Sequence, residues 1–208
     1  MKVPALTEQL ANGLEALQLP ADPGRIDALL KFLALMHKWG ATYNLTAIKD
    51  ARAAVGLHLL DSLAVSPYLQ GEHILDVGTG AGLPGIPLAI LNEQRRFVLL
   101  DSSAKKIRFV RQALVELGLR NVETAAVRVE EYQDLAGFDT VLARAFASLS
   151  EILQKTRRLL APGGRILALK GRVPEEEIQG LVSADIKVHG LTIPGLDIER
   201  HVIELRAD

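Results

Sequence analysis

The sequence predicts an α/β protein with an open sheet that is mostly parallel, has an antiparallel terminal strand and follows an N-terminal helical cap. Two observations support this fold class. From His73 onward, short apolar runs alternate with longer amphipathic segments, as strands and crossover helices do in a parallel sheet. Before His73, apolar residues recur at helical spacing. We therefore divide the chain into a helical cap, residues 1–70, and a sheet domain, residues 71–208.

Three helices are expected in the cap. The first is marked by leucines that repeat every three or four positions, namely Leu6, Leu10, Leu14 and Leu17. A second apolar stripe runs from Ile26 to Trp39, and Gly40 is expected to end that helix. A third helix is expected over residues 51–65.

Five strands are expected in the parallel part of the sheet, each apolar along its length because both of its faces are covered. In chain order their sequences are HILDVG, RRFVLLD, VETAAVRV, FDTVLARAFA and GRILALKG. Helices are expected between them over residues 84–91, 103–117 and 149–160. Two further strands, over residues 186–193 and 201–206, are expected to form a hairpin-like end to the sheet.

The composition excludes several function classes. The 208 residues are 49% hydrophobic and 24% charged, which is typical of a globular protein with a substantial core. Cysteine is absent, so disulfide scaffolds, thiolate metal sites and cysteine nucleophiles are excluded. The five histidines show no ligand spacing, and no metal site is expected. Because neither a secretory signal nor a run of about 18 apolar residues is found, we expect a cytoplasmic protein without a membrane partner.

The net charge of −1 hides two basic runs that contain no acidic residue. The first holds Lys105, Lys106, Arg108 and Arg111, and the second holds Lys155, Arg157, Arg158, Arg165, Lys170 and Arg172. Either run could contact nucleic-acid phosphates, or each could be an ordinary solvated face.

The segment DVGTGAGLPG, residues 76–85, places four glycines between an apolar strand and a helix, as in a nucleotide-type site. The lysine and hydroxyl of a P-loop are missing, which argues against nucleoside triphosphate hydrolysis. Asp101 ends the next strand, where its carboxylate can accept hydrogen bonds from ribose hydroxyls. Asp76 lies near the carboxyl end of the first strand, two residues before Gly78. A carboxylate there would repel a diphosphate and favour a cationic ligand such as S-adenosylmethionine.

Several motifs together resemble one family, the bacterial 16S ribosomal RNA guanine-N7 methyltransferases, also called glucose-inhibited division protein B. They are YNLT at residues 43–46, HLLDSL at 58–63, DVGTGAGLPGIP at 76–87, LDS at 100–102 followed by Lys105 and Lys106, RVEE at 128–131, RAFA at 144–147 and LKG at 169–171. The resemblance is strong over residues 36–172 and loose elsewhere. It implies the Rossmann-like fold of the S-adenosylmethionine-dependent methyltransferases.

The resemblance also implies a role for individual residues. Asp76, Gly78, Gly80 and Leu83 would form the loop that binds S-adenosylmethionine, and Asp101 would bind its ribose. Val129 and Glu130 would lie against the adenine. Arg144 would stand beside the methionine part of the cofactor and the target base, both as a cofactor-binding residue and as the catalytic residue that positions the reactants. The implied partner is 16S ribosomal RNA within the small ribosomal subunit, and a monomer is expected.

Methylation of guanine N7 explains why no acid–base constellation is found, since N7 carries a free in-plane lone pair and no proton. Three alternatives remain open at this point. The same sheet could carry an NAD-dependent oxidoreductase, against which Asp76 argues, or a non-catalytic RNA-binding module, against which Arg144 and the glycine loop argue. A small-molecule methyltransferase would instead require a closed apolar pocket under the helical cap.

Overall fold

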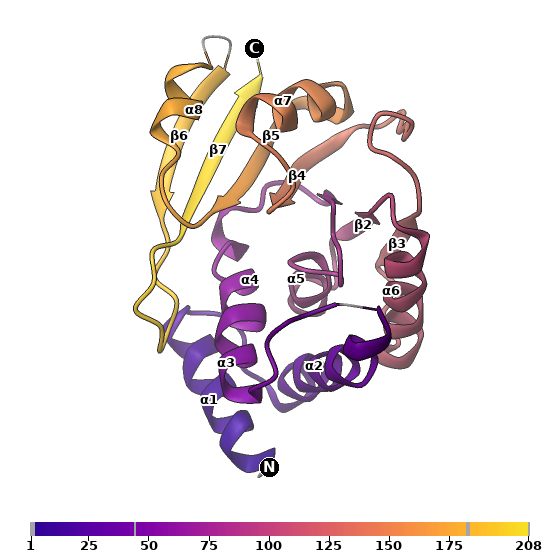
Figure 1. Ribbon diagram of the computed structural model, residues 1–208, viewed down its shortest axis with the longest axis vertical. Coiled ribbons are helices and arrows are strands. Elements are labelled where there is room, and N and C mark those ends of the chain that lie inside the picture. Colours follow the sequence, from indigo (N-terminus) through magenta and orange to yellow (C-terminus); the bar gives the residue numbers. More distant parts are fainter. Residues whose placement is uncertain (1–2, 44, 182–183, 208) are drawn as a thin grey trace.

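A single seven-stranded sheet, in the order β3-β2-β1-β4-β5-β7-β6, organises the computed structural model, which describes residues 3–43, 45–181 and 184–207 (Figure 1). The strands are β1 (His73–Val77), β2 (Arg96–Leu100), β3 (Val122–Ala125), β4 (Phe138–Arg144), β5 (Leu160–Lys170), β6 (Ala184–Gly190) and β7 (His201–Ala207). The first five run parallel, while β7 pairs antiparallel with both β5 and β6. The predicted fold class is confirmed.

Helices cover both faces of the sheet. They are α5 (Gly85–Leu91), α6 (Ala104–Leu117), α7 (Leu149–Thr156), the 3₁₀ turn η3 (Arg157–Leu159) and α8 (Glu175–Gln179). The residues of β1 alternate between two apolar clusters: Ile74 packs with α5, α6 and the cap, and Leu75 packs with α7. This alternation is the period of two expected for a strand covered on both faces.

Short polar signals fix where α6 and α7 begin. The Ser103 hydroxyl accepts from the Lys106 backbone N–H and starts α6, and Gly118, with φ of 69°, ends it. Ser148 and Glu151 form a reciprocal capping box at the start of α7. The predicted helix over residues 149–160 ends earlier than expected, because η3 and β5 take its last four positions.

The cap consists of α1 (Val3–Ala16), α2 (Pro23–Tyr43), α3 (Ala51–Ala54), a π-helical stretch η1 (Val55–Leu60), α4 (Asp61–Leu63) and the 3₁₀ turn η2 (Ser66–Tyr68). In Figure 1, α1 and α2 lie in the lower half of the view, and β6 and β7 lie at the upper left. Cap residues such as Phe32 and Leu59 belong to the same apolar cluster as Phe97 of β2. The two predicted regions therefore pack on one continuous core, and the boundary at residue 70 stays a prediction.

The second cap helix differs from its predicted length. Gly40 is its expected end, but α2 continues to Tyr43. A glycine inside a helix costs only about 1 kcal/mol relative to alanine, so it weakens a helix without stopping it. Asn44 of the motif at residues 43–46 lies outside the described residues.

Candidate functional site

The glycine-rich loop leaves β1 at the carboxyl edge of the sheet and is tied to β2. The backbone N–H groups of Gly78 and Thr79 both donate to the carbonyl of Leu100, at 2.8 and 3.0 Å. Gly80 has a φ of +60°, and a Cβ placed there would meet only the Gly78 carbonyl, at 3.9 Å. The outer side of the loop at Gly80 is therefore open space bounded by backbone, at the topological switch point where α/β sheets bind ligands.

Asp76 lies completely buried under this loop. Its Oδ2 accepts from the Thr79 hydroxyl at 2.6 Å and from the Gly85 N–H at 2.9 Å, while Oδ1 has no partner. Burial raises the pKa of Asp76 to about 6, and the hydrogen bonds from Thr79 and Gly85 oppose that shift. At neutral pH the carboxylate form still dominates. It holds both ends of the loop together and places a negative charge behind it, whereas direct contact with a ligand stays a prediction.

Asp101 connects the loop to a surface hollow. Its Oδ2 accepts from the Gly80 N–H at 3.0 Å, and Oδ1 accepts from the Ser103 N–H at 2.8 Å. Backbone groups on two sides thus fix the carboxylate, which is 7% exposed. The hollow has a volume of about 230 Å³. Its walls include Gly78, Asp101, Val129, Glu130, Ala145 and Phe146.

Three other predicted residues take different positions around the loop. Val129 is buried against the hollow, and Glu130 is exposed at its rim, where Lys155 lies 3.3 Å away. The side chain of Leu83 packs into the core, and its N–H donates to Thr79, so Leu83 shapes the loop from behind. The structure therefore brings Gly78, Asp101, Val129 and Glu130 together around the hollow, while Asp76 and Leu83 support the loop.

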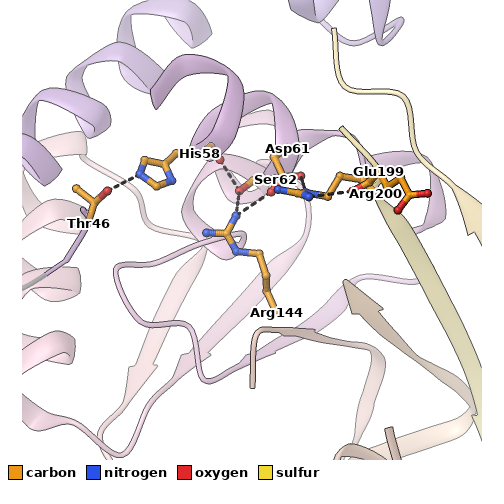
Figure 2. A network of polar contacts seen from close by, with 7 residues as sticks. All are labelled: Thr46, His58, Asp61, Ser62, Arg144, Glu199 and Arg200. Atoms are coloured by element: carbon orange, nitrogen blue, oxygen red, sulfur yellow. Dashed lines mark hydrogen bonds and ion pairs between the residues drawn. The ribbon is translucent and has the colours of Figure 1, made fainter. Parts of the chain in front are cut away.

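Arg144, at the end of β4, points toward the helical cap (Figure 2). Its Nη1 lies 3.4 Å from both Asp61 Oδ2 and Ser62 Oγ. Burial lowers the pKa of Arg144 from its usual value, and the carboxylates of Asp61 and Asp76 offset part of that shift. A guanidinium stays protonated in such a site, so Arg144 can donate hydrogen bonds but cannot act as a base.

Arg144 lines a second cavity of about 470 Å³, between the cap and the ends of β4 and β5. Its polar wall holds Asp61, Arg144 and Arg200, and its apolar wall includes Leu57, Leu169 and Leu191. Ala145 borders both this cavity and the hollow beside Asp101. The two spaces therefore adjoin at the residue that follows Arg144.

Asp61 and Arg200 receive no site role from the sequence motifs. His58 and Asp61 are three positions apart, a spacing that predicts a pair on one face of a regular α-helix, but the two side chains do not pair with each other. The π-helical turn of η1 changes the angular spacing, and His58 Nε2 lies 2.7 Å from Thr46 Oγ1 instead. Asp61 Oδ1 accepts from Arg200 Nε at 2.8 Å, across 139 residues of chain. One signal is present in the sequence: an aspartate within the apolar run LHLLDSLAV needs a buried partner.

The His58 ring lies in the wall of this cavity beside Arg144. Burial lowers the pKa of His58 to about 4, with a further contribution from the positive charge of Arg144. His58 is therefore neutral at pH 7. Its Nδ1 is buried without a partner.

Several residues of the two basic runs pair with acidic side chains or backbone carbonyls. Within the second run, Arg165 pairs with the buried Glu204 at 3.0 Å, Lys170 pairs with Glu177 at 3.3 Å, and Arg158 donates to the Val129 carbonyl at 2.5 Å. In the first run, Lys106 lies 3.9 Å from Asp101, while Arg108 and Arg111 are exposed on α6. Acidic residues outside the runs thus neutralise part of each run, and exposed arginines remain in both, Arg108 and Arg111 on α6 and Arg157 after α7.

The described part of the chain contains neither a group of side chains suited to bind a metal ion nor a membrane-spanning helix. Among residues 3–43, 45–181 and 184–207, no group of three or more histidine, aspartate or glutamate side chains could hold a metal ion. In the same ranges, no helix is long and apolar enough to cross a membrane.

Sequence comparisons connect the chain to known proteins. The family model described as "rRNA small subunit methyltransferase G" matches residues 25–202. A protein of Methylococcus capsulatus named "Ribosomal RNA small subunit methyltransferase G" is 53% identical over 198 residues, which cover 95% of this chain and 97% of the relative. A protein of Coxiella burnetii with the same name is 44% identical over 201 residues, covering 97% of this chain and 98% of the relative.

Solved structures resemble the fold at low identity. The N-methyltransferase NodS of Bradyrhizobium japonicum, in complex with S-adenosylhomocysteine, aligns with a TM-score of 0.57 at 14% identity, covering 82% of this chain and 98% of that one. An S-adenosylmethionine-dependent methyltransferase of Aquifex aeolicus aligns with a TM-score of 0.56 at 16% identity, covering 74% and 92% of the two chains. These similarities show the fold.

Proposed function

The chain belongs to the rRNA small subunit methyltransferase G family, and on that premise we propose that it methylates N7 of one guanine in 16S ribosomal RNA within the small subunit. It is a methyltransferase, and S-adenosylmethionine is its methyl donor. The observation that best supports the proposal is the contact between two spaces at Ala145. One is the hollow along the glycine loop, and the other is the cavity that contains Arg144.

The residues present fit S-adenosylmethionine. A Cβ at Gly80 would enter open space, so the loop offers backbone that a cofactor can approach closely. Asp101 is anchored by two backbone N–H groups, and its remaining lone pairs can accept from ribose hydroxyls. The buried Asp76 charge lies behind the loop and favours a cationic ligand over a diphosphate.

When bound, S-adenosylmethionine supplies an electrophilic methyl group. The in-plane lone pair of guanine N7 can form the new bond to carbon directly, and the electrons of the broken carbon–sulfur bond stay on sulfur. No proton has to be removed, so no general base is required. The protein then contributes by holding the reacting atoms in line at about 3–3.5 Å and by excluding water. Arg144 positions the reactants at the junction of the two spaces.

The proposal is tested by incubating the protein with radiolabelled S-adenosylmethionine and small ribosomal subunits from a strain that lacks this enzyme. We expect label in a single 7-methylguanosine of 16S ribosomal RNA, located by mapping the modified base. Label in a different base, in another RNA or only in small molecules would overturn the proposed substrate.

Membership of this family decides between the alternatives that the sequence left open. An NAD-dependent oxidoreductase and a non-catalytic RNA-binding module are both excluded. A small-molecule methyltransferase is not supported, since the relatives are named for ribosomal RNA. The cavity under the cap is also not wholly apolar, because two arginines and an aspartate form one of its walls.

We expect Asp101→Ala to weaken S-adenosylmethionine binding by roughly 1.5–3 kcal/mol, the range for hydrogen bonds to a charged group. The substitution removes an acceptor for the ribose and also releases the Gly80 N–H. Isothermal titration calorimetry measures the change. Asp185→Asn is a suitable control, because Asp185 is exposed on the edge strand β6. A change of a few tenths of a kcal/mol for Asp101→Ala would place the ribose elsewhere.

The exposed arginines of α6 provide a test of RNA binding that is separate from chemistry. We expect Arg108→Ala/Arg111→Ala to reduce the salt dependence of subunit binding. The slope of log affinity against log salt should fall by about 0.9 for each lost duplex-phosphate contact. Lys106 is left unchanged, because it lies 3.9 Å from Asp101 and could alter cofactor binding.

The matched control is Arg96→Ala/Arg120→Ala. It removes two exposed arginines that precede or begin strands at the opposite, amino edge of the sheet. We expect its salt slope to equal that of the wild type. If the α6 variant also keeps the wild-type slope and full activity on subunits, α6 is only a solvated face.

We propose that the protein acts as a monomer, since residues of one chain form both the hollow and the cavity. A cytoplasmic location follows from the proposed substrate, because bacterial ribosomal subunits are found in that compartment.

A further inference from the structure

The cavity under the cap has the properties of a site for a flat, polar ring. Its volume of about 470 Å³ lies within the range of small-molecule sites. Leu57, Leu169 and Leu191 supply apolar surface, and Asp61, Arg144 and Arg200 supply convergent polar groups. Enzymes that modify a base in RNA or DNA commonly extrude it into such a pocket and read its edges by hydrogen bonding.

Asp61 is a hydrogen-bond acceptor within this wall and cannot donate when ionised. Arg144 lies 3.4 Å from one of its oxygens, and Arg200 donates to the other at 2.8 Å. A carboxylate has about four lone-pair positions, so two remain for a ligand. Two arginines hold the Asp61 carboxylate in a fixed position (Figure 2). The cavity therefore contains a preoriented anionic acceptor beside a guanidinium donor.

Guanine complements this arrangement. Its N1–H and exocyclic 2-amino group are adjacent donors, and its O6 and N7 are adjacent acceptors. With N7 turned toward the cofactor hollow at Ala145, the donor edge turns away from the hollow, toward the cap wall that carries Asp61. At the same two positions adenine has an unprotonated N1 and a C2–H group. Neither can donate a hydrogen bond to the Asp61 carboxylate as the N1–H and 2-amino groups of guanine can.

We infer that this cavity receives the extruded target guanine and that Asp61 is the residue that distinguishes guanine from adenine, by accepting from its N1–H and 2-amino groups. The inference rests on the proposed function and names the part of the site that selects its substrate. Arg144 and Arg200 hold the Asp61 carboxylate, and the leucines contact the faces of the ring.

A double-mutant cycle tests the contact between Asp61 and the 2-amino group. Small subunits are reconstituted with 16S ribosomal RNA in which inosine replaces the mapped target guanosine. This removes only the 2-amino group and retains N7. Wild type and Asp61→Asn are then compared on guanosine and inosine substrates by kcat/KM for methyl transfer. Asp185→Asn is the matched control, at an exposed carboxylate near the amino edge of the sheet.

We expect inosine to lower kcat/KM of the wild type on the order of 10- to 100-fold, the effect of losing a hydrogen bond to a charged acceptor. Asp61→Asn should lose a larger factor on guanosine than on inosine, because on inosine the 2-amino contact is already absent and only the contact with N1–H remains to be lost. Its S-adenosylmethionine affinity should be unchanged. Asp185→Asn should behave as the wild type on both substrates.

Two results would overturn the inference while leaving the proposed function intact. The first is a wild type that methylates inosine as fast as guanosine, a result that does not depend on the folding of any variant. The second is a cycle in which the two losses multiply, which would make Asp61 only a positioning residue for Arg144. If the wild type fails to label guanine in 16S ribosomal RNA at all, the proposed function itself is overturned.

Discussion

Arg144→Ala should reduce methyl transfer to small subunits by about 100-fold or more, which is the scale of the loss when reacting groups are misplaced by about 1 Å. Arg144 lines the cavity under the cap. It directly precedes Ala145, which borders both this cavity and the hollow beside Asp101. Because the exposed arginines of α6 remain, the salt dependence of subunit binding should stay near that of the wild type. Single-turnover kinetics and salt titrations measure the two effects.

Two controls separate a loss of positioning from a loss of structure. Arg200 still pairs with Asp61 in this variant, so the buried carboxylate keeps a partner, and thermal unfolding should show a folded protein. Arg96→Ala removes an exposed arginine at the amino edge of the sheet and should retain full activity. Activity of Arg144→Ala within a few-fold of the wild type would remove Arg144 from the reaction site.

Gly80→Val should abolish S-adenosylmethionine binding while the fold persists. The φ of +60° at Gly80 is unfavourable for L-residues by about 1–2 kcal/mol, and a β-branched side chain is among the least tolerant. The added side chain would project into the open space that the cofactor is expected to occupy. Isothermal titration calorimetry should give no measurable heat of binding at concentrations that saturate the wild type.

Gly118→Val is the matched control for backbone strain. Gly118 has a φ of +69° and, like Gly80, has open space where a Cβ would lie, but it ends α6 away from the loop. Both variants should lose a similar amount of stability in denaturant unfolding, and only Gly80→Val should lose cofactor binding. Binding by Gly80→Val at close to wild-type affinity would show that the cofactor does not pass over Gly80.

Local sequence patterns predicted the presence of the helices and strands better than the residues at which the helices end. The alternation of apolar runs and amphipathic segments is a direct consequence of covering each strand on both faces, so the sheet and its helices followed from it. The residue at which a helix ends depends on smaller free-energy differences. Gly40 lies inside α2, and the last positions of the predicted helix over residues 149–160 belong to η3 and β5.

The sequence predicted the cofactor side of the site through residues that are close along the chain or at the ends of neighbouring strands. Gly78 and Gly80 lie just after β1, and Asp101 directly follows β2, so parallel pairing of the two strands brings all three together. Their roles in cofactor binding remain predictions. For Asp76 the structure shows a structural role, because its buried carboxylate accepts hydrogen bonds from Thr79 and Gly85 and so stabilises the loop.

The amino-acid sequence by itself determined the fold class, the glycine loop and the acid at the end of the second strand, because periodicity and short-range spacing encode them. Only the tertiary structure decided which charges meet. Asp61 lies 83 residues from Arg144 and 139 residues from Arg200 along the chain, and no local pattern connects them. Burial brings them together, because a carboxylate removed from water requires cationic or hydrogen-bonding partners wherever the packed chain can supply them. The same requirement pairs the buried Glu204 with Arg165 of the second basic run.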